Sequence, residues 1–187
     1  MSSTDEGFEA RLWTPFAVLG IRTEGDVLAE IKFLPKASKA LAPKNRLAAR
    51  ACAQIGRYLA DPEFRFDLPL ARRGTEFQRR VWTKIAAIGP GRTRSYGELA
   101  QELRSAPRAV GQACGENPFP LIVPCHRVVA AATIGGFAHS DGGFQLSVKR
   151  WLLEHEGAAK PLRRSERSRG GLLALKMGGN GKSYTAS

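Results

Sequence analysis

The sequence has few cysteines and no long apolar segment. Its 187 residues include three cysteines, and no two of them form a Cys-x-x-Cys pair. A small fold held together by disulfides is therefore excluded, and a reactive thiol becomes the chemistry to look for. No apolar run reaches the roughly 20 residues of a membrane span, and the start, MSSTDEGFEA, lacks the basic and then apolar order of a secretory signal. We therefore expect a cytoplasmic protein that does not associate with membranes.

Acidic residues are scarce relative to basic ones. The chain holds 29 Lys and Arg against 17 Asp and Glu, a formal net charge of +12. This excess favours a polyanionic partner such as nucleic acid, with an ordinary solvated basic surface as the alternative. Residues 158–187 hold seven of the basic residues and one acidic residue, and they are rich in Gly and Ser. We expect this basic tail to be disordered and to attract phosphate without sequence preference.

Residues 10–74 predict a small α/β domain, here called the N-terminal unit. Aliphatic and aromatic residues over 16–22 and 27–34 flank the turn signal TEGD and predict a β-hairpin. Apolar residues at helical spacing predict a helix over 43–61. Apolar residues then alternate with polar or small ones over 64–70, which predicts a third strand.

Residues 75–157 predict a mainly helical domain, here called the C-terminal unit. Thr75 and Ser95 each precede a Gln or Glu by three residues, so each predicts a capping box at the start of a helix. Ser105 predicts the cap of a third helix, with Pro107 in its first turn. Two short helices joined by a tight connection are the outline of a helix-turn-helix, although many helical hairpins bind nothing.

The segment over 117–129, NPFPLIVPCHRVV, carries the chemistry. It predicts an apolar strand that leads to Pro124, followed by Cys125 and His126. A thiol attacks well only as a thiolate, which a histidine network and oriented backbone groups stabilise. Because adjacent side chains seldom meet directly, we expect His126 to act on Cys125 through a bridging water. The alternative is an inert buried cysteine beside a structural histidine.

This segment resembles the O6-alkylguanine-DNA alkyltransferases, also called methylated-DNA–protein-cysteine methyltransferases. The signature of that family is a P-C-H-R-V core preceded by an N-P pair and an apolar strand, all of which are present here. The resemblance is strong over 77–157, weaker over 10–74 and absent from the tail. Outside the core it rests on the segments 77–82, 95–100, 108–111, 135–137 and 149–157.

The resemblance implies an α/β (α+β) fold. A ribonuclease-H-like domain is expected over 10–74, followed by a winged-helix-like domain with a helix-turn-helix over 75–157. The implied activity is direct repair of double-stranded DNA, in which a monomer moves the alkyl group of O6-alkylguanine to its own Cys125. O4-alkylthymine is left open as a second substrate. Transfer is expected to be irreversible and to occur once per molecule, because no ordinary side chain displaces a thioether sulfur.

The resemblance also implies roles for the residues around the thiol. Glu156 is expected to orient His126, and His126 to draw the proton from Cys125 through water. Asn117 is expected to tie the turn before the active-site strand to the DNA-binding helices. Tyr96 is expected to meet the flipped nucleotide and to donate a proton to the leaving purine. The alternative for Glu156 is a solvated helix charge, and for Asn117 a plain helix stop.

DNA contacts are expected from Ser95, Tyr96, Arg108 and Ala109. Arg108 resembles the arginine finger that fills the gap left by a flipped nucleotide, with a solvated helix arginine as the alternative. In the loop over 137–143 the alignment is ambiguous. In only one of the two possible alignments do Ser140 and Asp141 match the aromatic and serine positions of the family's pocket loop. No base contact is therefore assigned to this loop.

Neither a metal nor a cofactor is expected. His139 and His155 have no matched partner at zinc spacing, and the two remaining cysteines, Cys52 and Cys114, read as small core residues. Two rival functions remain open. One is a sensor of alkylated bases that lacks the nucleophile, which the presence of Cys125 disfavours. The other is a helix-turn-helix regulator of transcription, for which the thiol would be superfluous.

Overall fold

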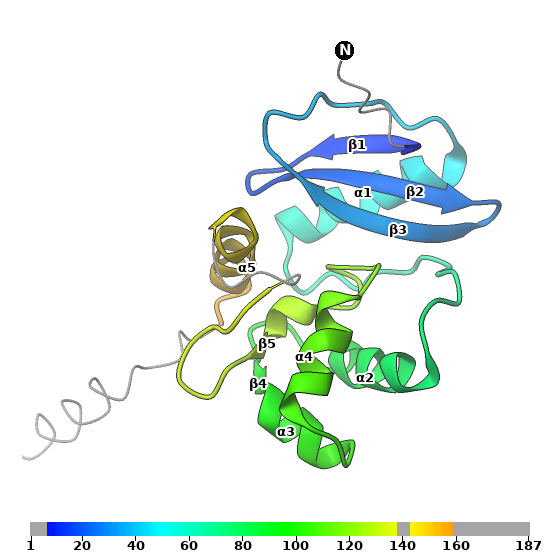
Figure 1. Cartoon of the computed structure of the whole chain (residues 1–187). Coiled ribbons are helices and arrows are strands. Elements are labelled where there is room, and N and C mark those ends of the chain that lie inside the picture. Colours follow the sequence, from blue (N-terminus) through cyan, green and yellow to red (C-terminus); the bar gives the residue numbers. More distant parts are fainter. Residues whose placement is uncertain (1–6, 138–142, 159–187) are drawn as a thin grey trace, which may run out of the picture.

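The computed structural model describes residues 7–137 and 143–158 (Figure 1). Its elements are β1 (Ala10–Trp13), β2 (Val18–Glu24), β3 (Val27–Leu34), α1 (Arg46–Ala60), α2 (Glu76–Ala86), β4 (Arg94–Ser95), α3 (Tyr96–Glu102), α4 (Pro107–Gly115), the 3-10 helix η1 (Cys125–Arg127), β5 (Val128–Val129) and α5 (Gly143–His155). The loop positions Ser140 and Asp141 and the basic tail beyond residue 158 lie outside the described residues, so the predictions for them stay predictions.

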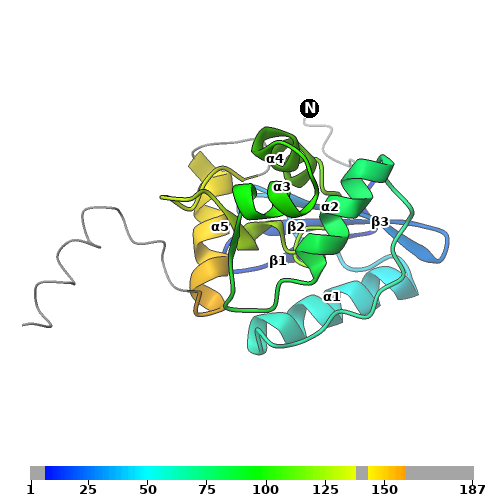
Figure 2. The same cartoon turned by 90° about the horizontal axis from the view of Figure 1, so that it is seen from below.

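The sheet and α1 form one half of the molecule, and α2, α3 and α4 form the other (Figures 1 and 2). Helix α5 lies along one side, where it packs against η1. A single cluster of buried apolar side chains runs through both halves. Contacts such as Phe16 on Trp151, with ring centroids 4.7 Å apart, join the N-terminal unit to α5. The boundary at residue 74 stays a prediction.

The predicted hairpin is confirmed as β2 and β3, which pair antiparallel. The sheet also contains β1, which the sequence did not predict. It pairs with β2 along its whole length, with Ala10 opposite Ile21. The predicted helix is confirmed as α1, which begins after Asn45, whose side chain accepts a bond from Ala48 N at 2.8 Å. Its face with Ile55 is buried against the sheet.

The predicted strand over 64–70 is wrong. Its alternate residues are half-buried, as expected for an extended chain, but the segment forms only one β-bridge among the described residues, between Leu28 and Leu70. Side chains bind its backbone instead, since Gln54 accepts from Asp67 N at 2.8 Å and donates to Asp67 O at 2.9 Å. The alternation of apolar and polar residues shows only which side chains are buried. A β-strand also needs a neighbouring strand whose backbone pairs with its own.

The two predicted capping boxes are confirmed at the starts of α2 and α3. The predicted Ser105 cap is wrong, because α4 begins one residue later, with Ala106 at the N-cap and Pro107 in the first turn. Ser105 instead donates its backbone N–H to Ala100 O at 2.8 Å in the tight turn between α3 and α4. The pair has the outline of the predicted helix-turn-helix, with Arg104 in the left-handed region at φ 51°.

The predicted strand before Cys125 is also wrong. The chain over 117–124 forms turns, with Leu121 at φ 77° and Val123 N donating to Phe119 O at 2.8 Å. Pro118 and Pro120 lack the N–H groups that a ladder needs, so the apolar composition is that of a buried loop. No helix in the described part of the chain is long and apolar enough to cross a membrane.

Candidate active site

Asn117 fixes the loop that presents Cys125. Its amide Nδ2 donates to Val123 O at 2.7 Å, and its Oδ1 accepts from Phe119 N at 3.0 Å. Cys125 N in turn donates to Val123 O at 2.8 Å. The amide thus closes the turn in front of the thiol, and the Asn117 side chain acts to lower the pKa of Cys125. The structure places Asn117 in the turn before Cys125, and its expected link to the DNA-binding helices stays a prediction.

A short pair of parallel strands joins the helix-turn-helix to this loop. Ser95 of β4 lies opposite Val129 of β5, two residues beyond η1. The same Ser95 caps α3, accepting from Glu98 N at 3.1 Å. The strand that leaves the thiol therefore positions the start of the first helix of the pair.

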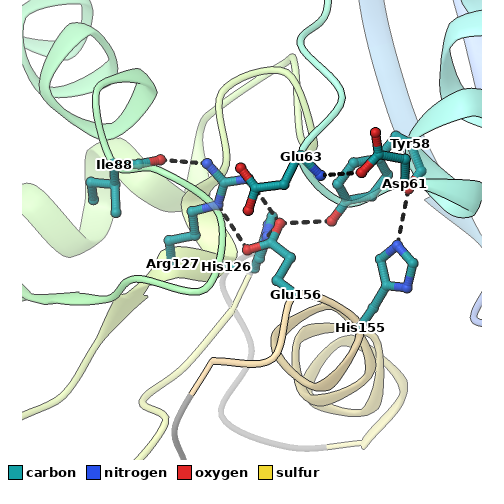
Figure 3. A network of polar contacts seen from close by, with 8 residues as sticks. All are labelled: Tyr58, Asp61, Glu63, Ile88, His126, Arg127, His155 and Glu156. Atoms are coloured by element: carbon teal, nitrogen blue, oxygen red, sulfur yellow. Dashed lines mark hydrogen bonds and ion pairs between the residues drawn. The ribbon is translucent and has the colours of Figure 1, made fainter.

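Glu156 lies at the centre of a buried polar network (Figure 3). Its Oε1 accepts from His126 Nε2 at 2.8 Å, from Arg127 Nη2 at 2.8 Å and from Tyr58 Oη at 2.7 Å, while its Oε2 accepts from Arg127 Nε at 2.9 Å. Arg127 Nη1 also donates to Ile88 O. The Glu156 side chain is fully buried. Burial alone would raise its pKa, but the bonds and charges of His126 and Arg127 outweigh burial and hold the pKa well below its usual range.

This network determines the protonation of His126. Burial lowers the pKa of His126, Glu156 raises it, and the positive charges of Arg127 and Lys149 lower it, with a net lowering. The ring is therefore neutral at neutral pH. Because an ionised carboxylate only accepts, Nε2 carries the ring proton and Nδ1 offers its lone pair. Nδ1 is buried and has no hydrogen-bond partner among the described residues, so His126 is set to accept one proton.

The Cys125 thiol is buried, with 5% of its surface exposed. Burial raises its pKa, and the Asn117 hydrogen bond, the Lys149 charge and the backbone N–H groups of Cys125 and His126 offset part of this increase. The net direction is upward, whereas the sequence suggested a lowered thiol pKa. In this resting state the thiol is protonated, and a base has to remove its proton during the reaction.

Lys149 is a buried cation that the sequence analysis assigned no role. Its Nζ donates to Val128 O at 2.6 Å and to Gly136 O at 2.9 Å, and the residue is fully buried. Burial lowers its pKa to about 8, although the cysteines Cys125 and Cys114 raise it. The ammonium therefore favours a thiolate on Cys125.

The lowered pKa of Lys149 predicts a pH-dependent stability. Between pH 8 and the ordinary lysine pKa, the folded state binds fewer protons than the unfolded state, so the free energy of unfolding rises with pH. Lys149→Met removes this contribution. Denaturant unfolding at a series of pH values should show a wild-type curve that rises relative to the variant curve by roughly 3 kcal/mol across this window, at about 1.4 kcal/mol per pKa unit. Parallel curves would contradict the assignment.

Tyr96 begins α3 and faces the loop that follows β5. Its hydroxyl donates to Gly136 O at 3.1 Å, and Lys149 Nζ lies 5.7 Å from its ring centroid. Gly135 adopts φ +68°, and a Cβ there would lie 3.0 Å from the Tyr96 ring. A glycine at this position therefore lets the ring lie against the loop. Tyr96 is half-buried.

The other expected DNA contacts lie on the helix-turn-helix. Arg108 and Ala109 occupy the first turn of α4. Arg108 is exposed, and across residues 7–137 and 143–158 no hydrogen bond or ion pair occupies its side chain. Ala109 and Ser95 are partly buried. These positions are compatible with a DNA-facing surface, and their contacts with DNA stay predictions.

The two remaining cysteines and His155 have structural positions. Cys114 is buried in α4, Cys52 is half-buried in α1, and both are free thiols. His155 stacks on Trp151 with ring centroids 4.8 Å apart and bonds to Tyr58 O at 3.0 Å. Among the residues that the structure describes, no three His, Cys, Asp or Glu side chains gather so as to hold a metal ion.

Three residues in or beside this network were not assigned a role from the sequence. Arg127 directly follows His126 in the P-C-H-R-V core, and this adjacency could have indicated a role for Arg127 in the site. Lys149 lies on the face of α5 that includes Leu152 and Leu153, and a lysine on a buried helix face is another signal. Tyr58 bonds to Glu156 across 98 residues of sequence, and no local pattern indicates that contact.

Comparison with known proteins identifies relatives. A family model described as the DNA-binding domain of 6-O-methylguanine DNA methyltransferase matches residues 76–158. The methylated-DNA–protein-cysteine methyltransferase of Mycobacterium bovis is 38% identical over 154 residues, which cover 79% of this chain and 91% of that protein.

Two crystal structures are similar over most of the chain. The O6-methylguanine methyltransferase of Mycobacterium tuberculosis has a TM-score of 0.66 at 36% identity and covers 79% of this chain and 90% of its own. Mycobacterium tuberculosis OGT in complex with DNA has a TM-score of 0.65 at 38% identity and covers 79% and 91%. The predicted α+β class and the predicted family are thereby confirmed, and the chain belongs to the methylated-DNA–protein-cysteine methyltransferase family.

Proposed function

We propose that this protein repairs DNA directly by transferring the alkyl group of O6-alkylguanine to Cys125. The observation that carries the proposal is the buried chain of groups from Glu156 through His126 to the Cys125 loop. The Mycobacterium bovis relative is named a methylated-DNA–protein-cysteine methyltransferase, and the Mycobacterium tuberculosis OGT structure is a complex with DNA. Both names agree with a cysteine acceptor and a DNA partner.

The transfer is a displacement at the alkyl carbon. The thiol proton passes through a bridging water to His126 Nδ1, and Glu156 stabilises the imidazolium through Nε2. The Cys125 sulfur forms a bond to the alkyl carbon while the bond from that carbon to O6 breaks. The electron pair of the broken bond moves onto the guanine. A proton from the Tyr96 hydroxyl keeps the leaving purine neutral, and Tyr96 regains a proton from solvent while His126 releases one. Cys125 ends as a thioether, and guanine is restored.

The substrate base has to leave the duplex to reach the thiol. Cys125 is buried and O6 lies within the base stack, so the nucleotide rotates out of the helix into the site. The helix-turn-helix supplies the adjacent DNA surface. Since every group of the proposed relay comes from one chain, we propose that the protein acts as a monomer. O4-alkylthymine is a second candidate substrate of the same site.

Intact mass spectrometry tests this function. Wild-type protein mixed with an excess of duplex that contains O6-methylguanine should gain the mass of one methyl group. Peptide mapping should locate that methyl on Cys125. A protein that binds the duplex and keeps its mass would contradict the proposal.

Arg108 is proposed to fill the gap that the flipped nucleotide leaves. Arg108→Ala should slow reaction with alkylated duplex by about tenfold, equivalent to roughly 1.4 kcal/mol, because the unstacked duplex loses a partner. Reaction with free O6-benzylguanine needs no flipping and should keep its rate. Arg80→Ala removes an exposed arginine of α2 and serves as the charge-matched control. Equal slowing on both substrates would mean that Arg108 shapes the pocket.

A further inference from the structure

The N-terminal unit contributes a side chain to the proton relay. Tyr58 lies near the end of α1, and 1% of its surface is exposed. Its hydroxyl donates to Glu156 Oε1 at 2.7 Å, the same oxygen that accepts from His126 (Figure 3). The nucleophile, the histidine and the carboxylate all lie in the C-terminal unit, so Tyr58 is a contribution from the other half of the molecule.

The hydrogen bonds to Glu156 show what this hydroxyl adds. Each oxygen of a carboxylate has about two acceptor sites in its plane. In Glu156, Oε1 accepts from His126, Tyr58 and Arg127, and Oε2 accepts from Arg127. Tyr58 therefore bonds to the same oxygen as His126 and shares its negative charge. A variant without the hydroxyl removes one of the three donors on this buried oxygen.

The charge balance around His126 gives this bond a chemical consequence. The titratable and charged groups that act on Glu156 and His126 are Tyr58 from α1, Arg127 from η1 and Lys149 from α5. His126 can accept the thiol proton only while its ring is neutral. A carboxylate with fewer donors attracts a proton on the imidazole more strongly and so favours the charged ring. Donors to Glu156 therefore keep His126 available as a base.

We propose that Tyr58 is a positioning residue of the alkyl-transfer site, which holds the Glu156 carboxylate on His126 and limits its attraction for a second imidazole proton. His126 then stays neutral at neutral pH and accepts the proton of Cys125. This inference rests on the proposed function for its kinetic consequence. Its electrostatic part concerns only Tyr58, Glu156 and His126 and is testable without any substrate. Burial and the Glu156 charge both raise the pKa of Tyr58, so the hydroxyl remains a donor.

Tyr58→Phe tests the proposal because it removes the hydroxyl and keeps the ring. In an NMR titration, the pKa of the His126 ring should rise by about one unit relative to wild type. The rate of transfer from free O6-benzylguanine at pH 7 should then fall by at most about threefold, because a one-unit rise from the ordinary pKa of about 6.5 lowers the neutral fraction from about three quarters to about one quarter. The loss should shrink as the pH rises, since His126 becomes neutral again.

Phe16→Leu is the matched control. It weakens a different contact of the N-terminal unit, that of the Phe16 ring with Trp151 of α5, and touches no group of the relay. It should lower stability to denaturant and keep the wild-type pH profile. An unchanged His126 titration in Tyr58→Phe, or a loss of rate that is equal at every pH, would overturn the proposal. A wild-type protein that takes no alkyl group would instead contradict the proposed function, and the NMR titration would still decide the role of Tyr58.

Discussion

Cys125→Ala will accept no methyl group from a duplex that contains O6-methylguanine, while the wild-type protein gains one methyl and stops. The thiol is the only part of the proposed site that can form the new bond to carbon, so its loss removes the reaction completely. The variant should still bind the duplex, because the helix-turn-helix and Arg108 are unchanged. Intact mass over time and a gel-shift assay on the same samples measure the two properties.

Cys114→Ala provides the control for this result. Cys114 is a second buried thiol, 6% exposed, in α4, and burial raises its pKa strongly. The control makes the same chemical change in the same half of the molecule and should keep the single methyl transfer. A methyl group on Cys114 or Cys52, or more than one methyl per molecule, would refute the assignment of Cys125.

The same experiment separates the rival functions. A sensor would bind the alkylated duplex with equal affinity in wild-type and Cys125→Ala protein and would never change in mass. A regulator of transcription would protect a defined sequence whether or not the DNA is alkylated. Mass gain with the wild-type protein and its loss in Cys125→Ala agree with neither alternative.

Local signals predicted those parts of the fold that depend on neighbouring residues. The capping boxes at Thr75 and Ser95 and the TEGD turn each use residues within a few positions of one another, and all three are found in the structure. The strands expected over 64–70 and before Cys125 failed because a strand needs a partner backbone. That partner is determined by the tertiary fold, and alternation or apolar composition does not reveal it.

The candidate site also has some residues that the sequence indicated and one that only the structure revealed. Cys125, His126 and Asn117 are close in sequence, and the resemblance added Glu156, which the structure places on His126. The structure then added Tyr58 from α1. Nothing in the pattern around it distinguishes it from an ordinary core residue on a helix face, since its function depends on a single hydrogen bond to a distant residue.

His126→Ala should slow transfer from O6-benzylguanine at pH 7 by about 10²-fold or more, the usual contribution of a general base. Burial raises the pKa of Cys125, so at neutral pH the thiol holds its proton and needs the base. As the pH rises beyond the ordinary thiol pKa of about 8.5, more of the thiol ionises unaided. The variant should therefore recover progressively toward the wild-type rate, and a plot of the rate ratio against pH measures that recovery.

Glu156→Gln should show the same trend, since the imidazolium formed on proton transfer loses its counter-charge. It also leaves Arg127 as a buried charge without a carboxylate, which costs about 3–5 kcal/mol of stability, so its rates are to be compared at temperatures where unfolding curves show a folded protein. His155→Ala is the control, because this neighbouring histidine bonds to Tyr58 O and not to Glu156. If His126→Ala and Glu156→Gln lost the same factor at every pH, these residues would position the thiol without ionising it, and the proposed relay would be wrong.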